Sequence, residues 1–171
     1  YAAGIHPFAW RGFWDYGTGA IGDMACHTAN MAFMALKLVH PTHLAAEAGD
    51  VNPLTCPSFA HVTMQFPSRG DLPPVSQHWY EGKKDGNKML PSEELCAKAI
   101  ALDTNAKRKG RLVASGSILV GDKGIAYSPD DYGSEVFFST GKNASGKLEK
   151  LPSNNGGDRG QKREWVDAIK A

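Results

Sequence analysis

The 171-residue chain has few cysteines and no excess of charge of either sign. Its three cysteines, Cys26, Cys56 and Cys96, are widely spaced and form no Cys-x-x-Cys pair, so neither a disulfide framework nor a cysteine zinc site is expected. Its 19 Lys and Arg residues against 18 Asp and Glu residues give a net charge of +1. This balance argues against a broad basic face, so no nucleic-acid partner is expected.

The chain also lacks a long hydrophobic run. The longest uncharged apolar stretch, residues 24–36, is shorter than the ~20 residues that a membrane-spanning helix needs, and no signal-peptide pattern stands at the start. No membrane is therefore expected as a partner. The compartment stays open, because a soluble protein fits either the cytoplasm or export to a bacterial periplasm. Since the chain opens in a motif-dense segment and stops inside an amphipathic pattern, we expect it to be part of a longer protein.

Hydrophobic patterning predicts several strands. Residues 60–66 alternate apolar and polar side chains, and residues 75–80 follow closely enough to form an antiparallel pair. Glycines at both ends of Gly121–Gly124 predict a hairpin turn. The remaining strands are expected at residues 44–51, 111–120, 125–127 and 135–139.

Three helices are expected among these strands. The first begins at Gly19 or Asp23 and continues to Val39, and its composition indicates burial on most sides. The second follows Ser92, a capping residue ahead of an acidic first turn, and the third covers residues 163–171. Residues 82–90 and 141–162 are expected to be exposed loops. The pattern predicts an α+β fold, in which helices pack on one face of an open, mainly antiparallel sheet.

A glycine-rich turn precedes the first expected helix. Residues 17–22, GTGAIG, match the Gly-x-Gly-x-x-Gly spacing of dinucleotide-binding turns. That fingerprint also requires a buried apolar strand immediately before it, whereas Arg11, Gly12 and Asp15 interrupt the preceding segment. We therefore favour a glycine-rich turn into a closely packed helix over a dinucleotide-binding turn.

The first expected helix carries one polar stripe. At 100° per residue, Asp23, His27 and Asn30 fall within about 60° of arc. A carboxylate four residues from a histidine can orient or charge the imidazole, which is the usual general base near neutral pH. The alternative is structural, with Asp23 capping the helix and His27 a satisfied core histidine. No third ligand stands nearby, so no metal is expected at this pair.

An aromatic segment surrounds the only arginine near this turn. Aromatic faces and an arginine fork suit sugars and carboxylates, but large aromatic residues are also ordinary packing material. The candidate binding residues in this segment are Trp10, Arg11, Trp14 and Tyr16.

Residues 10–30, WRGFWDYGTGAIGDMACHTAN, resemble the C-terminal half of the glucose–fructose oxidoreductase, inositol dehydrogenase and rhizopine-catabolism family. Its members carry a Gly-rich turn and then a helix with an Asp-x-Gly-x-His-x-x-Asp-like pattern, which corresponds here to residues 23–30. Residues 116–124 and 163–170 also resemble the family, so the resemblance spans nearly the whole chain. Ala25 stands for the Gly and Asn30 for the second Asp; Asn30 cannot ionise but can hydrogen-bond a hydroxyl.

The resemblance implies a single domain over residues 1–171 that binds substrate and forms oligomers, similar to the C-terminal domain of glyceraldehyde-3-phosphate dehydrogenase. An N-terminal Rossmann domain outside this chain would be its partner and would bind NAD or NADP. No cofactor-binding residue and no metal are therefore expected in this chain. Family members oxidise or reduce hydroxyls of sugars and polyols, and a homo-oligomer through the sheet face is implied.

The resemblance also implies roles for the site residues. His27 would take the proton from a substrate hydroxyl, and Asp23 would orient His27 or hold a neighbouring hydroxyl. A lysine absent from this chain would assist, so the chain alone is expected to be inactive. The pocket would be lined by Asn30, Trp10, Arg11, Trp14 and Tyr16. Two alternatives remain open: a structural or oligomerisation module with a degenerate site, and an NAD-dependent relative that cleaves glycosides by transient oxidation.

Overall fold

The strands of the protein form two antiparallel sheets. The computed structural model describes residues 8–108, 110–140 and 157–170. One sheet has the order β1 (His43–Gly49), β2 (Phe59–Phe66), β3 (Val75–Lys84) and β4 (Asn87–Lys88), and the other has the order β5 (Ser117–Gly121), β6 (Gly124–Ser128) and β7 (Phe137–Phe138). The predicted α+β fold with an open antiparallel sheet is confirmed, and the strands divide between two sheets rather than forming one.

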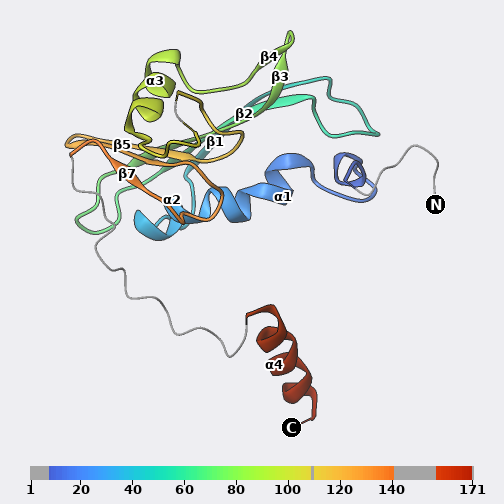
Figure 1. Ribbon diagram of the computed structural model, residues 1–171. Helices are drawn as coiled ribbons and strands as arrows, with labels where there is room; N and C mark the ends of the chain where they lie inside the picture. The colour runs from blue at the N-terminus through green and yellow to red at the C-terminus, as the bar shows by residue number, and fades with distance from the viewer. Residues whose placement is uncertain (1–7, 109, 141–156, 171) are drawn as a thin grey trace.

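The helices divide between the two sheets as well. A short 3₁₀ helix, η1 (Trp10–Gly12), leads into α1 (Gly19–Thr28) and α2 (Asn30–Ala35), which follow one another along one side of the strands (Figure 1). The first of these contacts β3 and the second contacts β5, whereas α3 (Glu93–Leu102) contacts β6. In the described ranges, none of the helices is both long and apolar enough to cross a membrane.

The pairing of β2 with β3 gives the larger sheet two different faces. Val62 lies opposite Trp79 and Met64 opposite Gln77, so these alternate residues share the face toward α1. At the end of this ladder Phe66 is 2% exposed and meets Phe33 of α2 edge-on, with ring centroids 5.5 Å apart. The intervening residues of both strands share the opposite face.

The prediction of one buried helix from residue 19 or 23 to residue 39 is wrong. At the break, the Thr28 carbonyl accepts a hydrogen bond of 2.7 Å from the Ser117 hydroxyl, which competes with helix continuation. α2 then ends in a Schellman motif, in which Lys37 has φ 51° and the Leu38 N–H donates to the Phe33 carbonyl. Most of α1 and all of α2 are half-buried or exposed, because only one side meets the sheets.

Other local predictions are confirmed in part. Ser92 caps α3 by accepting a hydrogen bond of 3.3 Å from the Leu95 N–H. The predicted strands and the hairpin at Gly121–Gly124 are present, but the strand predicted over residues 111–120 begins only at Ser117. The expected loop at residues 82–90 instead contains the end of β3, a turn at Asp85 and Gly86 with positive φ, and β4.

The C-terminal amphipathic segment is helical and longer than predicted. α4 covers Asp158–Lys170, so only residues 141–156 of the expected second loop lie outside the described residues. Its apolar residues Trp165 and Ile169 are 69% and 67% exposed. The apolar stripe of this helix is thus a surface feature.

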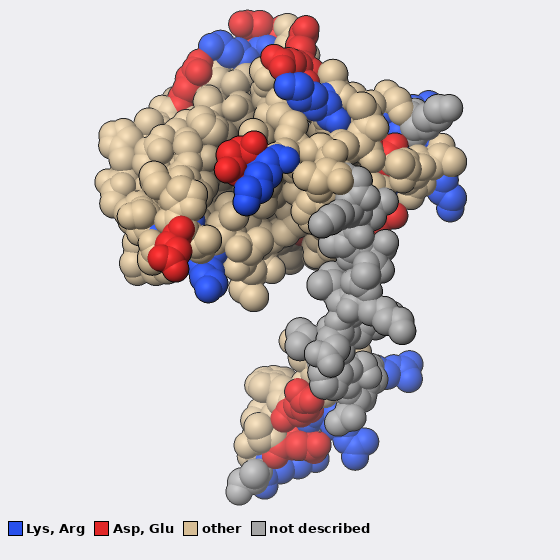
Figure 2. All heavy atoms as spheres, turned by 90° about the vertical axis from the view of Figure 1, so that its left-hand side faces the viewer, with Lys and Arg blue, Asp and Glu red and all other residues tan. Residues whose placement is uncertain are grey.

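Charged side chains are distributed in small mixed groups. On the face drawn in Figure 2, Lys and Arg lie beside Asp and Glu, and most of the surface between them is uncharged. The ion pairs include Lys84–Glu47 at 2.5 Å and Arg108–Glu135 at 2.6 Å. Positive and negative side chains therefore neutralise one another locally as well as over the whole sequence.

A buried carboxylate at the end of α3 makes stability depend on pH. The side chain of Asp103 is 1% exposed and accepts a 2.7 Å hydrogen bond from Arg108. Burial raises the pKa of Asp103, but hydrogen bonds from Arg108 and from the Asn105 N–H outweigh it and hold this pKa below its usual value of 3.8. The ionised form therefore stabilises the fold above that pH, and the contribution is lost as pH falls through the depressed pKa.

We predict that Asp103→Asn lowers the free energy of unfolding at pH 7 by about 1.5–3 kcal/mol, because a charge-assisted hydrogen bond is lost. Urea unfolding between pH 5 and pH 2 measures it. The variant should lose less stability than the wild type over this interval, whereas Asp122→Asn in the exposed β5–β6 turn should behave as the wild type. Equal acid sensitivity in Asp103→Asn and the wild type would contradict the assignment.

Candidate functional site

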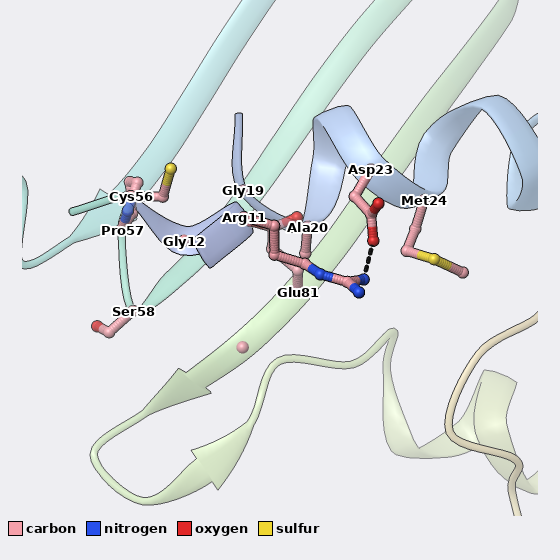
Figure 3. A pocket seen from close by; sticks show the side chains of 11 residues that line it. Arg11, Gly12, Gly19, Ala20, Asp23, Met24, Cys56, Pro57, Ser58 and Glu81 are labelled. Carbon is pink, nitrogen blue, oxygen red and sulfur yellow. Dashed lines mark hydrogen bonds and ion pairs between the residues drawn. The ribbon is translucent and has the colours of Figure 1, made fainter. Parts of the chain in front are cut away.

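A cavity of about 260 Å³ lies between the start of α1, the η1 segment and the end of β3. Figure 3 shows that its side chains come from segments far apart in the sequence. Arg11 and Asp23 meet at one side of it, and the Glu81 side chain comes from the strand beneath. The other lining residues are Gly12, Gly19, Ala20, Met24, Cys56, Pro57, Ser58 and Gly82.

The glycine-rich turn makes this arrangement possible. A Cβ at Gly17 would lie 2.6 Å from the Arg11 Cα and carbonyl oxygen, so only glycine lets the turn fold back onto η1. Gly19 begins α1 with φ 71°, and a Cβ there would lie 3.1 Å from the Cys56 Cβ. The η1 segment is held in place by a 2.8 Å hydrogen bond from the Cys56 N–H to the Gly12 carbonyl. The turn thus sets Arg11 against the first turns of α1.

Arg11 and Asp23 form an ion pair through Nη1 and Oδ2. Their side chains are 31% and 33% exposed, so the pair stands at the mouth of the cavity rather than in a dry core. The guanidinium also lies over the Phe8 ring, with Cζ 5.1 Å from the centroid. Arg11 Nε is buried without a hydrogen-bond partner in the described part of the chain.

Glu81 is the functional-site candidate that sequence reasoning missed. The Trp79 indole N–H donates a 2.6 Å hydrogen bond to Glu81 Oε2, which fixes the carboxylate toward α1. Burial raises the pKa of the Cys56 thiol, and the charge of Glu81 raises it further. The sequence pattern predicts the end of this strand at Tyr80, four residues before its end at Lys84. Extending the period-two alternation would have placed Glu81 on the same face as Gln77 and Trp79.

His27 lies one turn further along α1 and is exposed. No hydrogen bond joins its ring to Asp23, which is paired with Arg11 instead. The ring meets Tyr132 edge-on, with centroids 5.4 Å apart. The Asp23 carboxylate is therefore paired with Arg11 and does not orient the His27 ring in this structure.

The loop that carries Tyr132 is organised by one carboxylate. Asp130 accepts hydrogen bonds from three backbone N–H groups, those of Tyr132, Ser134 and Glu135, and from the Ser134 hydroxyl. Burial raises the pKa of Asp130, but these hydrogen bonds outweigh it and keep the pKa below its usual value. The loop thus presents Tyr132 to His27 in a defined conformation.

The remaining sequence-predicted site residues do not join the cavity beside Arg11. Asn30 is exposed and borders a second cavity of about 350 Å³ between α1, α2 and the sheet, together with Phe33, Met64 and Trp79. Trp14 is 46% exposed and donates its indole N–H to the Asn52 carbonyl at 3.0 Å. Trp10 and Tyr16 are 43% and 57% exposed and line neither cavity.

The residues of the glycine-rich turn do not fit a dinucleotide. The turn is preceded by η1 rather than by a strand, and Gly17 packs against the chain's own backbone where a pyrophosphate would need open N–H groups. Within the described ranges, no three His, Cys, Asp or Glu side chains are placed to hold a metal ion together. Comparison of the chain with protein-family models and with curated proteins found no match.

The effect of the Glu81 charge on the Cys56 thiol can be tested through thiol reactivity. Glu81→Gln keeps an acceptor for the Trp79 indole but removes the charge, so the pKa of Cys56 should fall and its thiolate fraction should rise. We predict that iodoacetamide alkylation of Cys56 at pH 8 accelerates by a factor below about ten.

Mass spectrometry of the individual cysteines measures these rates. Cys26, which is exposed and lies outside this cavity, serves as the internal control and should react at an unchanged rate. An unchanged Cys56 rate in a folded Glu81→Gln variant would show that the two groups do not interact.

Proposed function

We propose that the chain is the substrate-binding part of an NAD(P)-dependent oxidoreductase that acts on hydroxyls of sugars or polyols. The observation that carries the proposal is the cavity in which the Arg11–Asp23 pair and Glu81 meet. Two carboxylates accept hydrogen bonds from neighbouring hydroxyls, and an arginine donates to ring or hydroxyl oxygens. The resemblance of residues 10–30 to the oxidoreductase family supports the same substrate class independently of the cavity.

His27 is the proposed proton acceptor. Its exposed ring stands on the same stripe of α1 as Asp23, so a substrate held at Asp23 extends along the helix toward His27. Nicotinamide supplies hydride chemistry in such enzymes, and we assign its binding to a Rossmann domain outside this chain. The contribution of this chain is then to bind the polyol, to orient one hydroxyl and to take up its proton.

Direct binding tests the substrate class. The chain is titrated with D-glucose and with myo-inositol while ligand NMR saturation transfer is followed. We predict saturable millimolar binding that Asp23→Asn and Glu81→Gln each weaken, because each removes one charged acceptor. Asp122→Asn, which changes an exposed carboxylate outside the cavity, is the matched control. The absence of saturable binding for both compounds would reject the proposed substrate class.

Activity of the intact protein tests the role of His27. We predict that His27→Ala lowers kcat by about 10²–10⁴ in a variant that remains folded, because the general base is lost. His40→Ala, which removes an exposed histidine that no contact links to the cavity, should leave kcat unchanged. A loss below about tenfold in His27→Ala would remove this histidine from the mechanism.

Assembly through the sheet is the second part of the proposal. The face of β2 and β3 opposite α1 is polar rather than apolar, since it carries Thr63, Gln65, Ser76 and His78. A polar face favours an exchangeable homo-oligomer over a permanent structural module. Sedimentation velocity should detect self-association that Ser76→Arg weakens and that Asp122→Arg, in the β5–β6 turn, does not.

A further inference from the structure

Two histidines meet on the face of the larger sheet that points away from α1. His61 of β2 and His78 of β3 are diagonal neighbours across the strand pair, since His61 lies opposite Tyr80 and His78 lies opposite Thr63. His61 Nε2 and His78 Nδ1 are 3.1 Å apart. The His61 ring also stacks on Tyr80, with centroids 4.4 Å apart and planes inclined by 8°. The sheet register and the stacking therefore fix where the two imidazoles stand.

We propose that His61 and His78 form a chelating site for a divalent ion of the borderline class, such as Zn²⁺. Imidazole nitrogens bind Zn²⁺ at about 2.0–2.1 Å, so two nitrogens 3.1 Å apart subtend about 100° at a shared ion. This angle lies between the octahedral and tetrahedral values. The ion would replace the hydrogen bond that joins the two rings.

The surrounding side chains can orient the His78 ring. His78 Nε2 lies 3.0 Å from the Ser76 hydroxyl, which accepts a hydrogen bond of 3.0 Å from Gln65 Nε2. When Nε2 donates its proton to Ser76, the Nδ1 lone pair of His78 is free for a ligand. Thr63 Oγ1, 3.2 Å from Nδ1, stands beside the same position.

Burial lowers the pKa of His78 below its usual value, and the charge of His61 lowers it further. Glu47 lies opposite His61 on β1, but its carboxylate is paired with Lys84 at 2.5 Å. The protein thus offers two nitrogen ligands, and water fills the remaining positions. Binding is accordingly weaker than at a closed structural zinc site.

Zn²⁺ titration of the 171-residue chain tests the proposal. Isothermal calorimetry should give one site, and the ring ¹⁵N signals of His61 and His78 should shift together. We predict that His61→Ala and His78→Ala each weaken Zn²⁺ binding by about tenfold or more. Ser76→Ala, which leaves both ligands in place, should also weaken binding, because the His78 ring loses its hydrogen bond with the Ser76 hydroxyl.

Matched variants separate this site from others. His43→Ala removes a histidine on the same face, four positions along the ladder from His61, and should leave binding unchanged. Cys26→Ser removes the exposed thiol and should do the same. Binding that survives both His61→Ala and His78→Ala would overturn the proposal. Ring shifts confined to other histidines would overturn it as well, and this readout needs no variant to fold.

Discussion

The antiparallel pairing of β2 with β3 is the constraint on which both candidate sites depend. A strand directs successive side chains to opposite faces, so a single register sends Trp79 and Glu81 toward α1 and His78 and Tyr80 away from it. A shift by one residue would exchange the two sets and expose Phe66. The burial of Phe66 against Phe33 therefore also keeps the side chains of both candidate sites on their respective faces of the sheet.

Much of the fold could be predicted because its signals are local. The alternation in β2, the two-residue turn after Gly121 and the cap at Ser92 each depend on a few neighbouring residues. The break after Thr28 could not be predicted from local signals, because the hydroxyl that donates to the Thr28 carbonyl lies 89 positions away, at Ser117. The apolar composition of the first helix suggested burial, but the two sheets cover only one side of it.

The candidate site could be predicted only in part, because some of its contacts do not depend on local signals. The sequence identified Arg11 and Asp23 as candidates, but the helical spacing suggested His27 as the partner of Asp23. The chain folds back at Gly17 and brings Arg11 to the Asp23 carboxylate instead. This approach is possible because Gly17 has no side chain, and no periodic pattern in the sequence indicates it. Glu81 was missed because the strand was expected to end at Tyr80, whereas the pairing of β3 with β2 continues to Gly82. The resemblance to a family of oxidoreductases stays a proposal.

The turn built around Asp130 bears on how a ligand would meet α1. One carboxylate satisfies three backbone donors and a hydroxyl, so the conformational entropy of residues 130–135 is lost when the chain folds. A molecule that approaches His27 from the side of Tyr132 would meet an aromatic ring that is already positioned. Binding there would not carry the free-energy cost of ordering a loop. The affinity would then depend on how well the molecule fits the existing surface rather than on closure of the loop over it.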